Sequence, residues 1–338
     1  MKILFIGDLK TTFIKKDFDL LNDTHDITAI EPPKKKKDWL YFANKCKKEV
    51  KKTDIIFAWF ASWHAAIPLY YSRRYKKKIV VVVGGYDAAY VPEIDYGVFL
   101  RGIIEQKMTR YVLKKSNKIL VVDPTLKKQI QYILKDVCDN IDYLPTGYEV
   151  PLVDFEKKEN IILTVSAIQW SNISRKGLDS FVQIAKKFPK YKFIIAGKSK
   201  DNSINYLKKI AGKNVEFTEF LPEDELKKLY EKTKIYCQLS KHEGLPNALC
   251  EGMSYGCIPV GTYENGIPRA MGNCGYYAEY GDINEIKKAI DDATKAPMQQ
   301  RVNGRKRISE YFSIKRRKDG LNHILEKIVT KGSEKIEK

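Results

Sequence analysis

The sequence predicts an α/β protein built from two doubly wound domains, and three observations lead to that fold class. Short continuous runs of Ile, Val and Phe recur along the chain between longer amphipathic stretches, as is typical of parallel strands covered by helices on both faces. The 338 residues exceed the length at which a single core usually keeps growing. A segment with two prolines, a glycine and a charged run, residues 144–160, separates two such series.

We expect the N-terminal domain at residues 1–150 and the C-terminal domain at residues 151–300. Residues 301–338 are expected to form basic helices that pack back on the N-terminal domain and end in a frayed tail. The expected strands of the first domain are 3–6, 27–30, 55–60, 79–83, 119–122 and 141–144, and those of the second are 161–165, 193–196, 215–217, 235–239 and 258–260.

The net charge of +19 is unevenly distributed. Lys and Arg outnumber Asp and Glu by 27 to 18 in residues 1–150, by 22 to 19 in 151–300, and by 12 to 5 in 301–338. The excess indicates an anionic partner, such as phosphate or a membrane surface, or else a general Lys- and Ile-rich composition. A nucleic-acid-binding protein is a remote alternative, because no zinc finger, RNA-recognition motif or helix-turn-helix signature is present.

Targeting and metal signals are missing from the sequence. No run of about 18 apolar residues is present, and the first strand is interrupted too early for a signal peptide. The six cysteines form no Cys-x-x-Cys pair and have no histidines at zinc-site spacing. We therefore expect a cytoplasmic protein with reduced cysteines and no bound metal or other cofactor.

The most informative motif is the acid pair Glu243 and Glu251, which flanks a Gly-Leu-Pro-Asn turn. Pro246 suits the first position of a helix, whose free N–H groups point toward an anion. The arrangement offers a phosphate seat and two acceptors for hydroxyl groups, as a nucleotide-sugar requires. On spacing alone the two acids are more often ordinary surface residues, and an acid–base couple is the other interpretation.

Other polar residues follow the expected strands of the second half, where ligands bind in open α/β sheets. Arg175 and Lys176 come after strand 161–165 and would clamp a diphosphate, although a solvated basic turn explains them as well. Gly197 follows strand 193–196 in a turn suited to close ligand approach.

Residues 145–290 resemble the retaining glycosyltransferases of the GT-B fold, group 1 (family 4). The segments that carry the resemblance are 144–148, 175–177, 194–197, 215–221, 243–256 and 281–282. The resemblance implies two Rossmann-like domains facing a cleft, a nucleoside-diphosphate sugar as co-substrate, and transfer to a glycan or lipid-linked acceptor without a metal. A nucleotide-sugar epimerase or hydrolase with the same fold is the alternative.

The resemblance also implies roles for individual residues. Lys176 matches the lysine that binds the donor phosphate and, with Glu243 facing the donor sugar, is expected to be catalytic. The backbone of Gly244, Leu245, Pro246 and Asn247 would face sugar and diphosphate, and Glu251 would hold the ribose. Arg175 is a weaker match, because the family usually has its arginine further upstream, where this chain has Ser166-Ala167.

The first half departs further from the family pattern. Its first loop has one glycine, Gly7, and the usual His-Gly after the fourth strand is replaced by Gly84-Gly85-Tyr86-Asp87. Gly7, Gly84 and Gly85 are expected to let the donor or acceptor approach the backbone. Asp87 is expected to orient an acceptor hydroxyl as a catalytic group, or else to cap a plain turn.

A basic cluster, Lys34, Lys35, Lys36 and Lys37, precedes the aromatic residue Trp39. Basic residues beside interfacial aromatics favour docking to anionic lipid, at about 1 kcal/mol per basic residue near the surface. A solvated loop is the plain alternative. Docking would place the protein at the cytoplasmic face of a membrane.

Overall fold

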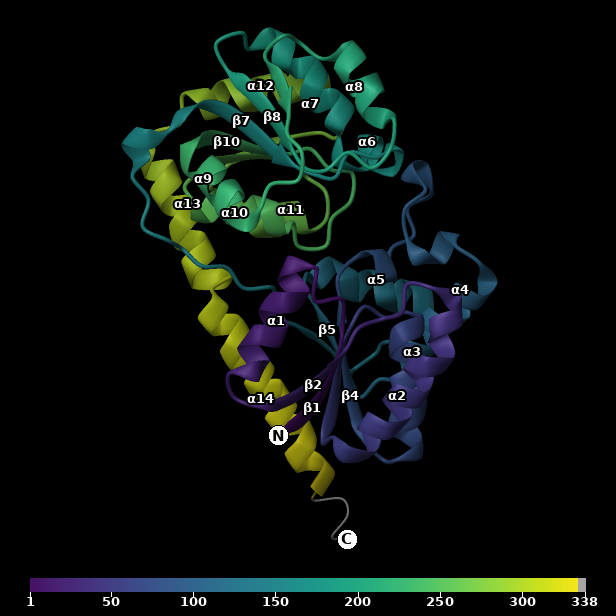
Figure 1. Cartoon of the computed structure of the whole chain (residues 1–338). Coiled ribbons are helices and arrows are strands. Elements are labelled where there is room, and N and C mark those ends of the chain that lie inside the picture. Colours follow the sequence, from purple (N-terminus) through teal and green to yellow (C-terminus); the bar gives the residue numbers. More distant parts are fainter. Residues whose placement is uncertain (334–338) are drawn as a thin grey trace. The chain divides into compact units, whose positions relative to one another are not determined.

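A computed structural model describes residues 1–333, and the expected frayed tail lies outside this range from residue 334 on. The chain divides into two compact units (Figure 1). The first comprises residues 1–92, 96–147 and 314 onward, and the second comprises residues 93–95 and 148–313. The division at 147/148 lies three residues before the expected boundary, and the basic C-terminal stretch is shared between the units.

The first unit is a six-stranded parallel sheet in the order β2-β1-β3-β4-β5-β6. Its strands are β1 (Lys2–Ile6), β2 (Asp26–Ile30), β3 (Ile55–Trp59), β4 (Lys78–Val83), β5 (Lys118–Val121) and β6 (Ile141–Tyr143). Its helices are α1 (Thr12–Asn22), α2 (Trp39–Lys52), α3 (Trp63–Arg74), α4 (Ile103–Lys115), α5 (Pro124–Leu134) and α14 (Ile314–Ser333). Every residue of β3 is buried, as expected of an apolar run in the centre of a parallel sheet.

The second unit is also a six-stranded parallel sheet, in the order β12-β11-β10-β7-β8-β9. Its strands are β7 (Glu159–Val165), β8 (Lys192–Ala196), β9 (Val215–Phe217), β10 (Thr233–Gln238), β11 (Ile258–Thr262) and β12 (Tyr276–Ala278). Its helices are α6 (Trp170–Lys176), α7 (Leu178–Ile184), α8 (Ser203–Ile210), α9 (Glu223–Lys232), α10 (Asn247–Ser254), α11 (Gly266–Met271), α12 (Ile283–Thr294) and α13 (Met298–Tyr311). Strand β12 was not expected from the sequence.

A buried ion pair fixes the last helix to the first unit. Arg317 on α14 donates to Asp17 on α1, with Nε 2.9 Å from Oδ1, and to the carbonyl oxygen of Leu144 at 2.7 Å. The indole nitrogen of Trp59 also donates to Asp17, at 3.0 Å. Because both charged side chains are almost fully buried, each needs the other, and α14 is an integral part of this unit.

Among the residues that the structure describes, none of the helices combines the length and apolar character needed to span a bilayer.

Candidate active site

The strand order of the second unit marks the place where a ligand is expected. The chain runs outward in one direction from β7 through β8 to β9, and in the other from β10 through β11 to β12. In such sheets the crevice beyond the carboxyl ends of the two central strands is the usual ligand site. The segments that follow β7 and β10 carry Lys176 and Glu243.

A glycine brings these two segments together. Gly177 ends α6 with a positive φ of 61°, and a Cβ at this position would lie 2.3 Å from the carbonyl oxygen of Leu239. The backbone N–H of Lys241 also donates to the carbonyl oxygen of Arg175, at 2.9 Å. Any larger residue at position 177 would therefore push α6 away from the end of β10. Arg175 and Lys176 lie in the last turn of α6, and not in a loop as their sequence context suggested.

The side chains of Lys176 and Glu243 form an ion pair at this junction, and Glu243 is only 9% exposed. The same carboxylate oxygen, Oε1, also accepts hydrogen bonds from Ser240 Oγ at 2.8 Å and from Gln238 Nε2 at 3.1 Å. Arg175 Nη1 lies 4.0 Å from this oxygen. Among residues 1–333, every hydrogen bond and ion pair found for Glu243 involves Oε1, so Oε2 retains its capacity to accept a hydroxyl.

Gln238 belongs to a buried chain of hydrogen bonds that fixes this orientation. The N–H of Val165 on β7 donates to Tyr236 Oη at 3.2 Å, and Tyr236 donates to Gln238 Oε1 at 3.4 Å. The Gln238 amide must then present its NH₂ group toward Glu243 and Ser240. Sequence reasoning missed Gln238 and Tyr236, although their positions at the end of a strand preceding an acid were a usable signal.

The electrostatics of the pair favour an ionised carboxylate. Burial alone would raise the pKa of Glu243, but the charges of Lys176 and Arg175 and the hydrogen bonds to Glu243 hold it below its ordinary value. Burial also lowers the pKa of His242, so this imidazole is neutral at pH 7. Burial lowers the pKa of Lys176 too, while the Glu243 carboxylate opposes this shift, so the site gathers one carboxylate and two basic side chains.

Helix α10 begins one residue later than the sequence suggested. Pro246 is the residue before the helix, with φ −76° and ψ 95°, and Asn247 is the first helical residue. Tyr148 donates from its hydroxyl to Asn247 Oδ1 at 2.6 Å, a contact across 99 residues that sequence reasoning missed. Gly244, Leu245 and Pro246 are buried in front of this helix start.

Glu251 lies one turn further along α10. Burial raises the pKa of the Tyr230 phenol well above its ordinary value, so its hydroxyl stays protonated and donates to Glu251 Oε2 at 3.4 Å. Tyr230 is 1% exposed whereas Glu251 is partly exposed. The tyrosine therefore supports the acid from the buried side.

The remaining glycine of this edge, Gly197, makes a backbone contact. It has φ 153°, and a Cβ there would lie 2.2 Å from the carbonyl oxygen of Ser166. Its small size is needed for the close approach of the segments after β7 and β8, which is a reason different from the expected ligand approach.

In the first unit, the carboxylate of Asp87, for which the sequence offered a catalytic role or a turn-capping role, is bound by backbone N–H groups. Asp87 is 2% exposed, and its carboxylate accepts from the backbone N–H groups of Ala61 at 2.8 Å, Gly84 at 3.1 Å and Gly85 at 3.0 Å. Burial raises its pKa despite these hydrogen bonds. We assign Asp87 to the structure of the turn, because its two oxygens are already used by backbone donors.

The glycines of the first unit are likewise explained by packing. A Cβ at Gly7 would lie 2.7 Å from Ile14, and a Cβ at Gly84 would lie 2.6 Å from the Phe60 ring. Gly85 has φ 140°, which L-residues rarely adopt. Packing against Ile14 and Phe60 is thus a reason for glycine at Gly7 and Gly84 that is separate from the expected approach of donor or acceptor.

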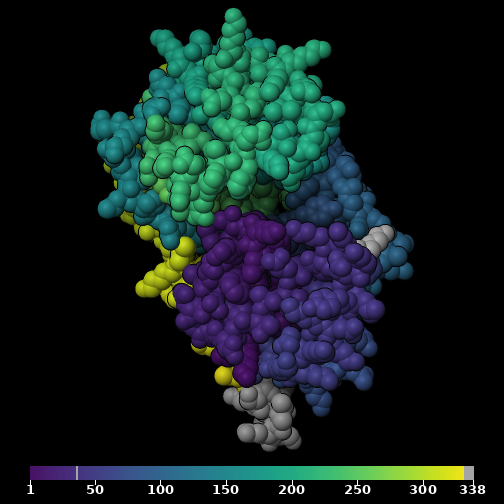
Figure 2. Space-filling view, viewed as in Figure 1, coloured from purple at the N-terminus to yellow at the C-terminus, as the bar shows by residue number. Residues whose placement is uncertain are grey.

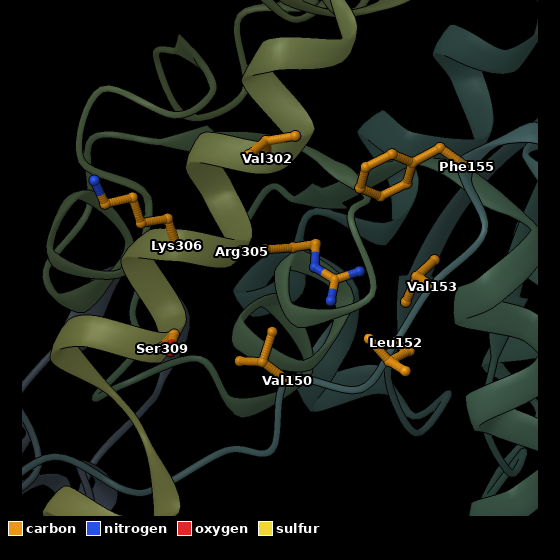
Figure 3. Close-up of a pocket in the computed structure, with 8 residues that line it drawn as sticks. All are labelled: Val150, Leu152, Val153, Phe155, Val302, Arg305, Lys306 and Ser309. Carbon is orange, nitrogen blue, oxygen red and sulfur yellow. The ribbon is translucent and has the colours of Figure 1, made fainter.

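The second unit also has a pocket away from these residues. A shallow pocket of about 350 Å³ lies between residues 150–155 and α13 (Figure 3), where Arg305 donates to the carbonyl oxygen of Pro151 and covers the Phe155 ring. None of its lining residues belongs to the Lys176–Glu243 site. Among the described residues, no group of three His, Cys, Asp or Glu side chains is arranged to hold a metal.

Comparison with known proteins agrees with the fold. Residues 153–312 match the family described as Glycosyl transferases group 1. HepE of Anabaena, solved in complex with UDP and glucose, has a TM-score of 0.79 at 12% identity over 96% of this chain and 99% of that chain. Sucrose-phosphate synthase of Thermosynechococcus elongatus has a TM-score of 0.78 at 12% identity over 98% and 99% of the two chains.

A sequence relative of Campylobacter jejuni is 31% identical over 113 residues, which are 32% of this chain and 31% of that protein. It is named GalNAc-alpha-(1->4)-GalNAc-alpha-(1->3)-diNAcBac-PP-undecaprenol alpha-1,4-N-acetyl-D-galactosaminyltransferase. The chain spans about a third of the length of the curated relatives it matches.

The two parallel sheets and these likenesses define a GT-B fold. The second unit is similar to the group 1 glycosyltransferases, because the match to that family, residues 153–312, lies within it.

Proposed function

We propose that this protein transfers a sugar from a nucleoside-diphosphate sugar to a hydroxyl group of a glycan or lipid-linked acceptor, with retention of configuration. The observation that carries the proposal is the Lys176–Glu243 pair at the switch point of the second sheet, with Glu251 on the following helix. The complexes of HepE with UDP and glucose and with UDP-glucose support a nucleotide-sugar donor.

The donor's diphosphate would bind the cations and the start of α10. Lys176 has three N–H donors and uses one of them for Glu243, so the others remain for phosphate oxygens. Arg175 and the backbone N–H groups at the start of α10 add positive potential. Together they stabilise the charge that develops on the leaving diphosphate, and we propose that no metal ion is needed for this step.

The sugar and ribose would be held by the two acids. Glu243 Oε2 accepts a sugar hydroxyl while Oε1 stays bound to Lys176, Ser240 and Gln238, and Glu251 accepts from the ribose hydroxyls. In this role Glu243 is a binding group and not a nucleophile. We favour attack of the acceptor hydroxyl on the same face that the diphosphate leaves, with its proton passing to the leaving phosphate.

The location of the protein is proposed from the first unit. Lys34, Lys35 and Lys37 are exposed, and the side chain of Lys36 lies outside the described part of the structure. Trp39 is partly buried against Phe42 and Trp63, with ring centroids 5.7 and 6.2 Å away, whereas Leu40 and Tyr41 are 74% and 72% exposed. We propose that Leu40 and Tyr41, rather than Trp39, insert into the cytoplasmic face of an anionic membrane.

Product analysis with radiolabelled nucleotide sugars tests the activity. UDP-, GDP- and ADP-sugars are screened first by thermal shift, and the stabilising donor is then incubated with and without lipid-linked acceptors and with EDTA. Labelled glycolipid with an α-linked sugar, formed equally in EDTA, is expected. A free epimerised nucleotide sugar, or free sugar alone, would identify the epimerase or hydrolase instead.

Vesicle co-sedimentation tests the membrane proposal. Binding to vesicles with anionic lipid should exceed binding to neutral vesicles, and a double Leu40→Ser, Tyr41→Ser substitution should weaken it. A matched control is Tyr132→Ser, an equally exposed side chain on α5 (81%). Equal and negligible binding of the unmodified protein to both vesicle types would reject membrane docking.

A further inference from the structure

The second unit carries a paired aromatic surface outside the Lys176–Glu243 site. Trp170, the first residue of α6, is 53% exposed, and Tyr206 on α8 is 37% exposed. Their ring centroids are 5.7 Å apart with an interplanar angle of 37°. Helices α6 and α8 lie in the same part of the second unit in Figure 1, and the α8 region is at the surface in Figure 2. The two neighbouring rings therefore present aromatic faces at the surface of the second unit.

The Trp170 ring is held in a fixed orientation by two hydrogen bonds. Its backbone N–H donates to Asp201 Oδ2 at 3.0 Å, and its indole N–H donates to Asn202 Oδ1 at 2.8 Å. The loop that supplies these acceptors is itself fixed, because Ile168 exchanges backbone hydrogen bonds with Lys198 and Lys200 at 3.0 and 2.9 Å. The polar edge of the indole is thus used by protein, and the apolar face is left for contact.

The chemistry around the rings indicates the kind of ligand. The neighbouring side chains are amides, a hydroxyl and a carboxylate: Gln169, Ser171, Asp201 and Asn202. A lipid surface would call for exposed aliphatic groups here. The Asp201 carboxylate, which accepts the Trp170 backbone N–H, would repel a phosphate-bearing ligand. Lys198 and Lys200 lie on the same loop, but neither of them is bonded to Trp170. A sugar ring, with an apolar C–H face and a rim of hydroxyl groups, complements both the aromatic faces and the polar surround.

We propose that Trp170 and Tyr206 form a binding platform for a neutral oligosaccharide, with one sugar ring stacked on the indole. Helix α6 runs from this platform to Lys176, a distance of roughly 9 Å at about 1.5 Å per residue. The bound chain is therefore close to the donor phosphates and is the acceptor glycan, an assignment that rests on the proposed function. The platform recognises sugars remote from the reacting hydroxyl.

Saturation-transfer NMR with maltotetraose, cellotetraose and chitotetraose tests the platform on the complete protein without donor. At least one of these oligosaccharides should bind, and Trp170→Ala and Tyr206→Ala should each weaken its binding at least tenfold. Trp170→Phe should restore part of the affinity, because the ring face is kept. Tyr311→Ala on α13, which removes a 48% exposed aromatic ring, is the control and should bind as the unmodified protein does.

The same variants separate this proposal from the proposed function. Trp170→Ala should raise KM for the acceptor and leave the thermal shift produced by the nucleotide-sugar unchanged. A normal nucleotide-sugar response with no saturable binding of any of the three oligosaccharides overturns the platform alone. Oligosaccharide binding without any nucleotide-sugar response overturns the transferase assignment and leaves the platform standing. Equal oligosaccharide affinity of Trp170→Ala and the unmodified protein also overturns the platform.

Discussion

The carboxyl edges of the two sheets carry buried acids in opposite situations. Glu243 in the second unit concentrates its protein contacts on one oxygen, and cations are its strongest partners. Asp87 in the first unit uses both oxygens for three backbone N–H groups of its own turn and of Ala61. Both acids follow a central parallel strand, so topology alone does not distinguish them. Glu243, which we propose binds the donor sugar, differs from Asp87 in that one of its oxygens has no donor among residues 1–333 and that basic side chains lie beside it.

The largest expected effect comes from removing the cation of the second unit. Lys176→Ala should lower kcat about 100- to 1,000-fold, as expected when one preorganised electrostatic group is lost from a transition state. Steady-state kinetics with the donor found by thermal shift measures it. Lys192→Ala, which removes a half-exposed lysine from β8, is the control and should leave kcat unchanged. A Lys176→Ala variant with normal kcat would show that the lysine beside Glu243 does not give this acid a role different from that of Asp87.

Asp87→Ala should act on stability instead. It leaves backbone donors of the turn unsatisfied in a buried place, so the free energy of unfolding should fall by about 2–4 kcal/mol. Urea denaturation measures the loss, and the thermal shift produced by the nucleotide-sugar should be as large as in the unmodified protein. If Asp87→Ala kept its stability but lost turnover, the catalytic role expected from the sequence would be restored.

Much of the fold and part of the candidate site were predictable from the sequence. The strand runs placed each expected strand within one or two residues, because buried parallel strands are continuous apolar segments. The same runs placed Lys176 and Glu243 after the ends of two strands, and the structure shows that these strands, β7 and β10, are neighbours in the sheet. Strand β12 was missed because three residues, two of them partly exposed tyrosines, give no such run.

The sequence does not reveal the direction in which a side chain points. An acid three residues after a Gly turn can face a ligand or its own backbone, and only the packed structure shows that Asp87 faces the backbone. Tyr148 and Asn247 meet across 99 residues, and the Gln238 chain joins two strands that are far apart in sequence. Such pairs are fixed by tertiary packing rather than by local pattern.

The two acids should also respond oppositely to pH. The lowered pKa of Glu243 means that its ionised form stabilises the fold above its ordinary pKa and that this contribution is lost as pH falls through the folded value. The raised pKa of Asp87 means that the native state binds a proton more readily than the unfolded state does. The protonated Asp87 therefore stabilises the fold at low pH, and this stabilisation declines as pH rises from the ordinary pKa of the group to its pKa in the folded protein.

Urea titrations between pH 3 and pH 7 compare the two acids through their amide variants. Relative to the unmodified protein, Glu243→Gln should lose less stability on acidification, and Asp87→Asn should lose more. Changes of the same sign in both variants would contradict the opposite electrostatic settings of the two edges.

The smallest expected effect concerns the residue that supports the start of α10. Tyr148→Phe removes the hydroxyl that donates to Asn247 and also bonds the Cys250 side chain. Loss of a neutral hydrogen bond costs about 1 kcal/mol, so KM for the donor should rise about fivefold with little change in kcat. Asn247→Ala should raise KM for the donor as well. Because the two side chains bond each other, the double variant should show less than the sum of the two free-energy changes. If the two free-energy changes were strictly additive, or if stability changed without a change in KM, Tyr148 would support the fold of the second unit and not donor binding at the start of α10.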